Sequence, residues 1–421
     1  MYLQHDASNR DVISVVFVDA GGGKMTNDRP LTGIRVLDLS RVVAGPLCGR
    51  MLADQGAEVI KVEPPNRDMT RKAPPIIEGF SSYYAHLNAG KIGLCVDLTD
   101  GEASSLVARL ADESDVVLEN FRPGVLARFG LDAASLRRRN TGLVYCSISG
   151  YGQTGPWADR RCYAPVVHGE AGLIATNARL HDMPMRPEAL SHADIQSGLM
   201  AMGAICSALF ARERGGAGAH LDISLAEVSV YLNEFSAPEL CGQTGPATYA
   251  GAASLVLTLG DGTHVVTQGN PVDNFRMWAK AMGRPELIKD PRFADQASRI
   301  QNRAEIDRLI LEFSLTFDSF DALHTSVDPH RIAIGIVRSV SELAATDWAI
   351  ERRLIAEPIP GLHLPRVPYR STSGEIGAVA PPPSRGEHNR EILTRLTDMD
   401  DASIDRLEER GAIQTAEDGN S

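Results

Sequence analysis

One aspartate stands where the sequence turns from a polar loop into a long apolar segment. Asp194 lies in S-H-A-D-I-Q-S-G-L-M, and the clearest predicted helix of the chain runs from Ile195 to about Arg212. An aspartate at such a boundary can be a structural cap that accepts backbone N–H groups. The same position favours an ionised carboxylate, because the positive end of the helix dipole lies there, and an ionised carboxylate can attack a thioester carbonyl. Position alone leaves both interpretations open.

Two further polar residues lie in an apolar, glycine-containing segment. His168 and Glu170 occur in V-V-H-G-E-A-G-L. Isolated residues of this kind commonly serve packing or an interface. The functional alternative is an auxiliary acid or base, or a group that positions an acyl carboxylate.

Basic residues follow three successive predicted strands, as a site for a phosphate-bearing ligand requires. The three clusters contain Lys61, Arg67 and Arg71, then Arg122 and Arg128, then Arg160 and Arg161. The chain has no G-x-G-x-x-G that opens a helix and no P-loop spacing, which argues against a nicotinamide or ATP enzyme. It also has no G-x-S-x-G elbow and no H-E-x-x-H, which removes the commonest hydrolase templates.

Composition and charge narrow the function class. The 421 residues are 43% hydrophobic and 23% charged, with a formal net charge of −12, which disfavours nucleic acid and anionic membranes as partners. The six cysteines form no C-x-x-C pair, so we expect neither disulfides nor a metal site. We find no apolar run of the length that a spanning helix needs and expect a cytoplasmic protein.

The elements expected around these residues alternate between strand and helix. GIRVLDLS, AGPLCGRMLADQGA and EVIKVE form a β-α-β unit, and the alternation continues to LVYCSIS. This pattern predicts an α/β fold with a doubly wound, Rossmann-like parallel sheet over about residues 30–150, whose ligands gather at the carboxyl ends of the strands. Short strands such as SLVLTL and THVVTQG alternate with helices in a predicted smaller α/β domain.

We expect four segments along the chain. Residues 1–28 form a loosely attached extension, and 29–230 form the first part of a large Rossmann-like domain. Residues 231–345 form the small domain, and 346–421 return to the large domain and end in a tail.

Several segments together resemble the family III coenzyme A transferases of the CaiB/BaiF type, which include formyl-coenzyme A and carnitine coenzyme A transferases and, as a branch, α-methylacyl-coenzyme A racemases. The matching segments are PLTGIRVLDLSRVVAGPLCGRMLADQGAEVIKVEPP, NAGKIGLCVDLTDGE, DVVLENFRPGVLARFGLD, LVYCSISGYGQTGP, ADIQSGLMA and GEHNREIL. They run in family order over about residues 29–396. The resemblance therefore covers nearly the whole chain.

The resemblance implies an open-ring subunit that threads through its partner to form an interlocked homodimer. It also implies that Asp194, in A-D-I-Q-S-G, is the catalytic nucleophile. Asp194 would attack an acyl-coenzyme A donor and carry coenzyme A as an aspartyl thioester to an organic (di)carboxylic acid. Coenzyme A would thus be a substrate, with no permanently bound cofactor and no metal.

By the same resemblance, Val42, Ala44, Asn120, Phe121, Arg128 and Arg161 would line the coenzyme A site. Arg71 joins them as a candidate from the basic clusters. The chain departs from the family at Ala164, where many transferases have a second carboxylate, and at Val43, where formyl-coenzyme A transferase has glutamine. Cys162, Tyr163 and Ala164 also replace the Gly-His-Asp segment of the racemases.

Two alternatives remain open beside the transferase. A racemase or epimerase of 2-methylacyl thioesters would need another base, with His168 or Glu170 as the candidates. A non-catalytic coenzyme A-binding subunit would pair with a related active chain in a hetero-oligomer. The retained Asp194 argues against this last alternative.

Overall fold

The computed structural model describes residues 29–66, 68–181, 183–243, 254–372, 374–377 and 380–415. The extension expected over residues 1–28 and the basic candidate Arg67 lie outside the described residues.

The chain divides into two compact units. The first contains residues up to Ala171, then Glu188–Leu232, then the chain from Ile350 onward. The second contains Gly172–Pro187 and Asn233–Ala349. The segment Gly172–Pro187 thus groups with the second unit, whereas the sequence analysis placed it in the large domain.

A six-stranded parallel sheet forms the centre of the first unit. Its strand order is β5-β2-β1-β6-β7-β8, and every neighbouring pair is parallel. In chain order the strands are β1 (Arg35–Asp38), β2 (Glu58–Glu63), β5 (Ile92–Cys95), β6 (Val116–Glu119), β7 (Val144–Ser149) and β8 (His220–Ser224). The parallel α/β fold predicted from the alternating pattern is confirmed.

Helices cover both faces of this sheet because successive strand residues point to opposite sides. Leu37 belongs to one apolar cluster and Val36 to the other. The first cluster includes residues of α3 (Gly101–Asp112), α4 (Ala133–Arg139), α16 (Asn389–Thr397) and α17 (Asp401–Glu409). The second includes residues of α1 (Ala44–Asp54), α5 (Ala164–Glu170), α7 (His192–Glu213) and α8 (Leu225–Tyr231).

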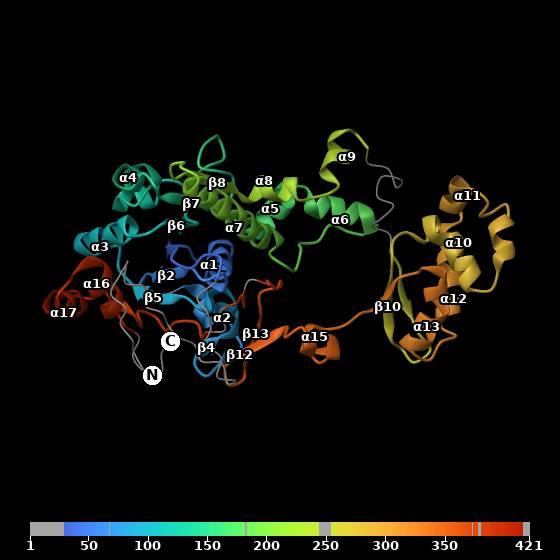
Figure 1. Ribbon diagram of the computed structural model, residues 1–421. Coiled ribbons are helices and arrows are strands. Elements are labelled where there is room, and N and C mark those ends of the chain that lie inside the picture. The colour runs from blue at the N-terminus through green and yellow to red at the C-terminus, as the bar shows by residue number, and fades with distance from the viewer. Residues whose placement is uncertain are drawn as a thin grey trace. The chain divides into compact units, whose positions relative to one another are not determined.

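The segment GEHNREIL closes the sheet at its β5 edge. The Gly93 N–H donates to His388 Nδ1 at 3.2 Å, and the Cys95 N–H donates to Asn389 Oδ1 at 2.9 Å. The His388 N–H returns a bond to the Gly93 carbonyl at 3.0 Å. Two side chains thereby take the place of a neighbouring strand, and α16 then lies beside α3 and β5 (Figure 1). An unpaired edge would otherwise expose these backbone groups.

Shorter elements complete the first unit. They are η1 (Met69–Lys72), β3 (Ile76–Ile77), β4 (Phe80–Ser81), α2 (Ser82–Asn88), η2 (Leu126–Phe129), β12 (Ile355–Ile359) and β13 (Leu362–Pro365). Helix α15 (Asp347–Glu351) spans the boundary between the units.

The second unit contains a three-stranded antiparallel sheet of order β11-β10-β9. Its strands are β9 (Val256–Thr258), β10 (His264–Thr267) and β11 (Ile334–Ile336). Its helices are α6 (Leu173–His181), α9 (Ser236–Leu240), α10 (Pro271–Ala281), η4 (Pro285–Lys289), α11 (Gln296–Gln301), α12 (Arg303–Ser314), α13 (Phe320–Val327), η5 (Asp328–His330) and α14 (Val340–Ala344). Trp278 and Phe275 are fully buried in its core.

Helix α7 corrects two expectations. It begins at His192, three residues before the predicted start, so Asp194 lies inside the first turn and Ser191 is the N-cap residue. By length and composition it is also apolar enough to cross a membrane, although the sequence analysis found no such segment. Glycine and serine residues interrupt its apolar residues, so its hydrophobicity is apparent only when averaged over the whole helix. In the structure α7 packs against α1, β7 and α8, and one such helix is weak evidence for a membrane span.

Candidate active site

The strand order places a switch point between β1 and β6. From β1 the chain continues to β2 and β5 on one side, and it returns to the other side as β6. Doubly wound α/β sheets commonly bind ligands at the carboxyl ends of the strands beside such a switch point. Val42 and Ala44 follow β1, and Asn120 and Phe121 follow β6, so four predicted coenzyme A ligands lie at this point.

The loop after β1 is held in an uncommon conformation. Val42 has φ +70°, a region that β-branched residues rarely adopt. Its N–H donates to Asp68 Oδ2 at 2.9 Å, and Asp68 Oδ1 accepts the N–H of Thr70 at 3.0 Å. Through these two hydrogen bonds the buried Asp68 side chain links the loop to η1. Helix α1 then begins at Ala44 with no side chain capping its first turn.

Reciprocal hydrogen bonds join the loops after β1 and β6. The Arg41 N–H donates to Asn120 Oδ1 at 2.9 Å, and Asn120 Nδ2 donates to the Arg41 carbonyl at 2.8 Å. The Arg41 guanidinium lies 5.3 Å from the centre of the Phe121 ring. Arg41 is exposed and adds a positive charge that the sequence analysis missed. Its position directly before Val42, a predicted coenzyme A ligand, could have identified Arg41 from the sequence.

A network of buried charged side chains holds the end of β1 and the loop that follows it. Lys91 Nζ donates to Asp38 Oδ2 at 2.8 Å, and the Ser40 N–H donates to Asp38 Oδ1 at 2.9 Å. Lys61 Nζ donates to the Ser40 carbonyl and is fully buried. Lys61 was a candidate for phosphate binding. It lies inside β2 and faces the protein interior instead.

A glycine one turn further along α7 than Asp194 packs against the start of α1. A side chain at Gly198 would place its Cβ 2.6 Å from the Ala44 carbonyl oxygen, so only glycine permits this approach of the two helices. Burial raises the pKa of Asp194 to about 6. The carboxyl group is thus mostly ionised at neutral pH but incompletely solvated, which suits a nucleophile.

Two side chains that the sequence analysis did not select lie near enough to Asp194 for its charge to affect them. Burial, and secondly the charge of Asp194, raise the pKa of the Tyr83 hydroxyl. The same two causes raise the pKa of the Cys162 thiol to about 11. Both groups therefore remain protonated beside the carboxylate. They come from α2 and from the segment before α5, so only the fold brings them to Asp194.

The predicted basic ligands divide into two groups. Arg128 on η2 and Arg161 before α5 are exposed, as phosphate ligands need to be. Arg71 is only 4% exposed: its guanidinium donates to both Glu63 oxygens, to the Tyr84 hydroxyl at 2.7 Å and to the Pro383 carbonyl at 3.0 Å. Arg71 therefore links parts of the first unit, and we leave it out of the proposed coenzyme A site.

Both predicted auxiliary residues have partners in the structure. His168 Nε2 accepts the N–H of Ala193 at 3.1 Å, and the imidazole is fully buried. Glu170 forms an ion pair with Arg160 at 2.7 Å, and that guanidinium lies 4.4 Å from the centre of the Trp157 ring.

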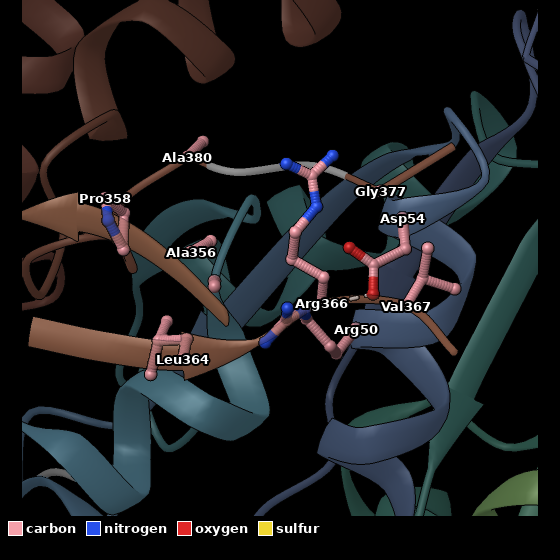
Figure 2. Close-up of a pocket in the computed structure, with 10 residues that line it drawn as sticks. Arg50, Asp54, Ala356, Pro358, Leu364, Arg366, Val367, Gly377 and Ala380 are labelled. Carbon is pink, nitrogen blue, oxygen red and sulfur yellow. Dashed lines mark hydrogen bonds and ion pairs between the residues drawn. The ribbon is translucent and has the colours of Figure 1, made fainter. Parts of the chain in front are cut away.

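A separate cavity of about 10 Å³ lies between α1 and the β12–β13 hairpin, and it is large enough for about one water molecule. Figure 2 shows Arg50 and Asp54 on α1 and Leu364 on β13 among the residues that line it. None of the predicted site residues lines this cavity. Across the described parts of the chain, no cluster of three or more His, Cys, Asp or Glu side chains could hold a metal ion.

The sequence is similar to known proteins over most of its length. The family model for CoA-transferase family III matches residues 31–389, so the chain belongs to that family. Succinate–glutarate CoA-transferase of Agrobacterium fabrum is 34% identical over 388 residues, which cover 87% of this chain and 96% of the relative. Succinyl-CoA–D-citramalate CoA-transferase of Chloroflexus aurantiacus is 34% identical over 91% of this chain and 98% of its own.

A solved structure extends the similarity to the fold. The crystal structure of a CaiB/BaiF family protein from Brucella suis has a TM-score of 0.77 and 32% identity, and it covers 88% of this chain and 100% of its own. The chain is thus an enzyme of the CoA-transferase type with the mixed α/β fold of CaiB/BaiF proteins.

Proposed function

We propose that this enzyme moves coenzyme A from an acyl-coenzyme A thioester to a dicarboxylic acid, and that Asp194 carries the coenzyme A between them. The observation that supports this most strongly is the carboxyl group of Asp194 in the first turn of α7, where burial raises its pKa to about 6. A partly buried carboxylate has lost some of its hydration, and the N-terminal end of α7 favours its ionised form.

The proposed exchange proceeds in covalent steps. An Asp194 oxygen attacks the thioester carbonyl of the donor, the C–S bond breaks, and coenzyme A leaves as a thiolate. The thiolate then attacks the Asp194 carbonyl carbon of the resulting anhydride, which releases the donor acid and leaves an aspartyl-coenzyme A thioester. The acceptor carboxylate attacks this thioester, the C–S bond breaks, and coenzyme A thiolate leaves a second anhydride between Asp194 and the acceptor. The thiolate then attacks the acceptor carbonyl carbon, which forms the new acyl-coenzyme A and releases the Asp194 carboxylate. Asp194 is regenerated as a carboxylate, so the exchange needs no net proton or oxidant.

The substrate class rests on the relatives. The names of the two curated relatives given above specify succinate, glutarate and D-citramalate, all of which are dicarboxylic acids. Two relatives at 34% identity with dicarboxylate substrates favour the same class here, with succinyl-coenzyme A as the first donor to test.

The arrangement of the switch point supports a site for coenzyme A. Arg41, Arg128 and Arg161 are exposed and provide positive charge for phosphates in a protein whose net charge is −12. Phe121 and the apolar residues at the start of α1 provide surface for the adenine. The start of α1, where no side chain caps the helix, adds to the attraction for anions.

The racemase alternative finds less support. A racemase needs a base with a free lone pair near the α-carbon of the substrate. His168 uses its Nε2 lone pair to accept the Ala193 N–H, and Glu170 is paired with Arg160. Exchange of the α-hydrogen of a 2-methylacyl thioester into deuterium oxide, measured beside coenzyme A transfer, distinguishes the two reactions.

We also infer a homodimer, which the family resemblance implies as an interlocked pair. Three apolar residues of α7 are exposed in the single chain: Ile195 at 42%, Leu199 at 53% and Phe210 at 65%. A helix of a water-soluble chain rarely leaves such a face uncovered. Light scattering after size-exclusion chromatography of the protein purified alone should give twice the chain mass. A monomer that gains activity only with a related chain would favour the hetero-oligomer.

The transfer assay tests the function as a whole. Purified enzyme is incubated with succinyl-coenzyme A and each of a series of C4 to C6 dicarboxylates, and the new thioester is followed by liquid chromatography. We expect transfer by the wild type and by Glu170→Gln, and none by Asp194→Ala. Undiminished transfer by Asp194→Ala would overturn the proposed role of Asp194.

A further inference from the structure

Helix α7 begins without a capping side chain of its own. Its N-cap residue, Ser191, has φ −80° and ψ 58° and makes no side-chain hydrogen bond to the first turn. A cap normally accepts the N–H of the second or third helical residue. Here the second helical N–H, that of Ala193, donates instead to Nε2 of His168 at 3.1 Å. A histidine on α5 thus satisfies the donor directly before Asp194.

The surroundings make this bond costly to lose. His168, Val167 and Ala193 are all fully buried, and the latter two belong to the apolar cluster between α5, α7 and the sheet. A backbone N–H that loses its acceptor in such a place has no water to replace it. The first turn of α7 would have to shift to recover a partner, and Asp194 would shift with it.

The bond also specifies the protonation state of the imidazole. Because Nε2 accepts, the proton lies on Nδ1 and the ring is neutral. Burial, and secondly the neighbouring His192, lower the pKa of His168, while Glu188 opposes them. Helix α8 also packs against α5, but its titratable residues Glu227 and Tyr231 are exposed. On α5 itself, Glu170 is engaged with Arg160.

We propose that His168 is a positioning residue, which caps α7 from outside the helix and thereby fixes the Asp194 carboxylate against the thioester carbonyl. This inference rests on the proposed function, in which Asp194 is the nucleophile. It gives His168 a role other than the auxiliary acid or base considered from the sequence. The imidazole accepts one hydrogen bond throughout the reaction and transfers no proton.

Two variants separate the roles. His168→Gln keeps an acceptor that can reach the Ala193 N–H, whereas His168→Leu keeps the volume and removes the acceptor. We expect kcat of His168→Leu to fall about 10- to 100-fold, as small displacements of reacting groups typically cause, with KM for the acyl-coenzyme A within about threefold of wild type. His168→Gln should recover most of kcat. His363→Leu on β13, an exposed histidine of the same unit, serves as the control for the substitution.

The pH profile gives a second readout. Protonated His168 cannot accept the Ala193 N–H, so two protonations, of Asp194 and of His168, reduce the wild-type rate at acid pH. His168→Gln has only the first, and its acid limb should be less steep than that of wild type. Circular dichroism and thermal unfolding of each variant establish that it is folded before its rates are compared.

The outcomes are distinct. A folded His168→Leu with the kcat of wild type would overturn the proposal. A folded His168→Gln as slow as His168→Leu would indicate proton transfer and would equally overturn it. Wild type and Asp194→Asn are measured alongside. If wild type transfers no coenzyme A, the proposed function fails, and if Asp194→Asn transfers it normally, the proposed role of Asp194 fails. An inactive Asp194→Asn beside an unaffected His168→Leu refutes only the role of His168.

Discussion

Two aspartates of the first unit have opposite surroundings. Asp38 ends β1 and is held by the Lys91 ammonium and the Ser40 backbone; although burial alone would raise its pKa, Lys91 and Lys61 keep that pKa below the usual value. Asp194 lies in the first turn of α7, and burial raises its pKa to about 6. The first carboxylate is stabilised and structural. The second carboxylate has its pKa raised by burial, and such a perturbed carboxylate is suited to act as a nucleophile.

The two arginines Arg71 and Arg128 repeat this contrast. The Arg71 guanidinium is occupied by Glu63, Tyr84 and the Pro383 carbonyl, while Arg128 is exposed on η2, which follows β6 in the chain. Saturated hydrogen bonding identifies groups that stabilise the fold. Available groups at the switch point identify those that can bind substrate.

The largest difference between the aspartates should be in rate. Asp194→Asn removes the nucleophile and should lower kcat for coenzyme A transfer by about 10³-fold or more, because every covalent step passes through that oxygen. Steady-state transfer from succinyl-coenzyme A measures the loss. A kcat of Asp194→Asn within tenfold of wild type, with deamidation back to aspartate excluded by mass spectrometry, would show that Asp194 is not the nucleophile.

The largest difference in stability should lie at Asp38. Asp38→Asn leaves Lys91 as a buried charge without its carboxylate and should lower the free energy of unfolding by about 3–5 kcal/mol. Urea unfolding followed by circular dichroism measures this. Asn88 and the Pro46 carbonyl also accept from Lys91; if they suffice, the loss will be below about 1 kcal/mol, and Asp38 is not the structural counterpart described above.

The arginine pair should separate stability from binding. Arg71→Met should lower the free energy of unfolding by about 2–4 kcal/mol, because Glu63 is left buried without its partner. Arg128→Met should leave the melting temperature unchanged and raise KM for acyl-coenzyme A about tenfold, through a lost phosphate contact. Thermal unfolding and kinetics of both variants are compared. Equal effects of the two substitutions on KM would place Arg71 in the ligand site after all.

The smallest effect, and the most specific, is a gain in stability at Asp194. Because its folded pKa is raised, the folded protein holds this proton at a pH where the unfolded chain has released it. Wild type should therefore lose stability as pH rises from about 4 to about 6 and stay lower above that. Asp194→Asn lacks this loss and should be about 1–2 kcal/mol more stable at neutral pH. A less stable variant would mean that the carboxylate is well paired.

The sequence was informative where local pattern determines structure. The strands of the parallel sheet are short apolar runs between turns, so GIRVLDLS, EVIKVE and LVYCSIS could be placed from their residue pattern alone. Asp194 could be selected because a helix start and a family motif coincide there. The predicted start of α7 was three residues late, because Asp194 was considered as the cap, whereas Ser191 is the N-cap residue in the structure.

Contacts distant in sequence could not be foreseen. A basic residue at the end of a strand looks the same whether it faces a ligand or the core. The partner of Lys61, the Ser40 carbonyl, lies 21 residues away, and Arg71 reaches Pro383 across 312 residues. Tyr83 and Cys162 have no motif of their own and reach Asp194 only through the fold. The hydrogen bond from Ala193 to His168 joins residues 25 positions apart in the same way.

The most direct test of the central claim is to trap the covalent intermediate. Wild type and Asp194→Ala are incubated with succinyl-coenzyme A, quenched with hydroxylamine and digested, and the peptide containing residue 194 is sequenced by mass spectrometry. The account predicts an aspartyl hydroxamate at Asp194 that depends on the donor and is absent from Asp194→Ala. A transferase that is active with the same donor but carries no modification at Asp194 would contradict it.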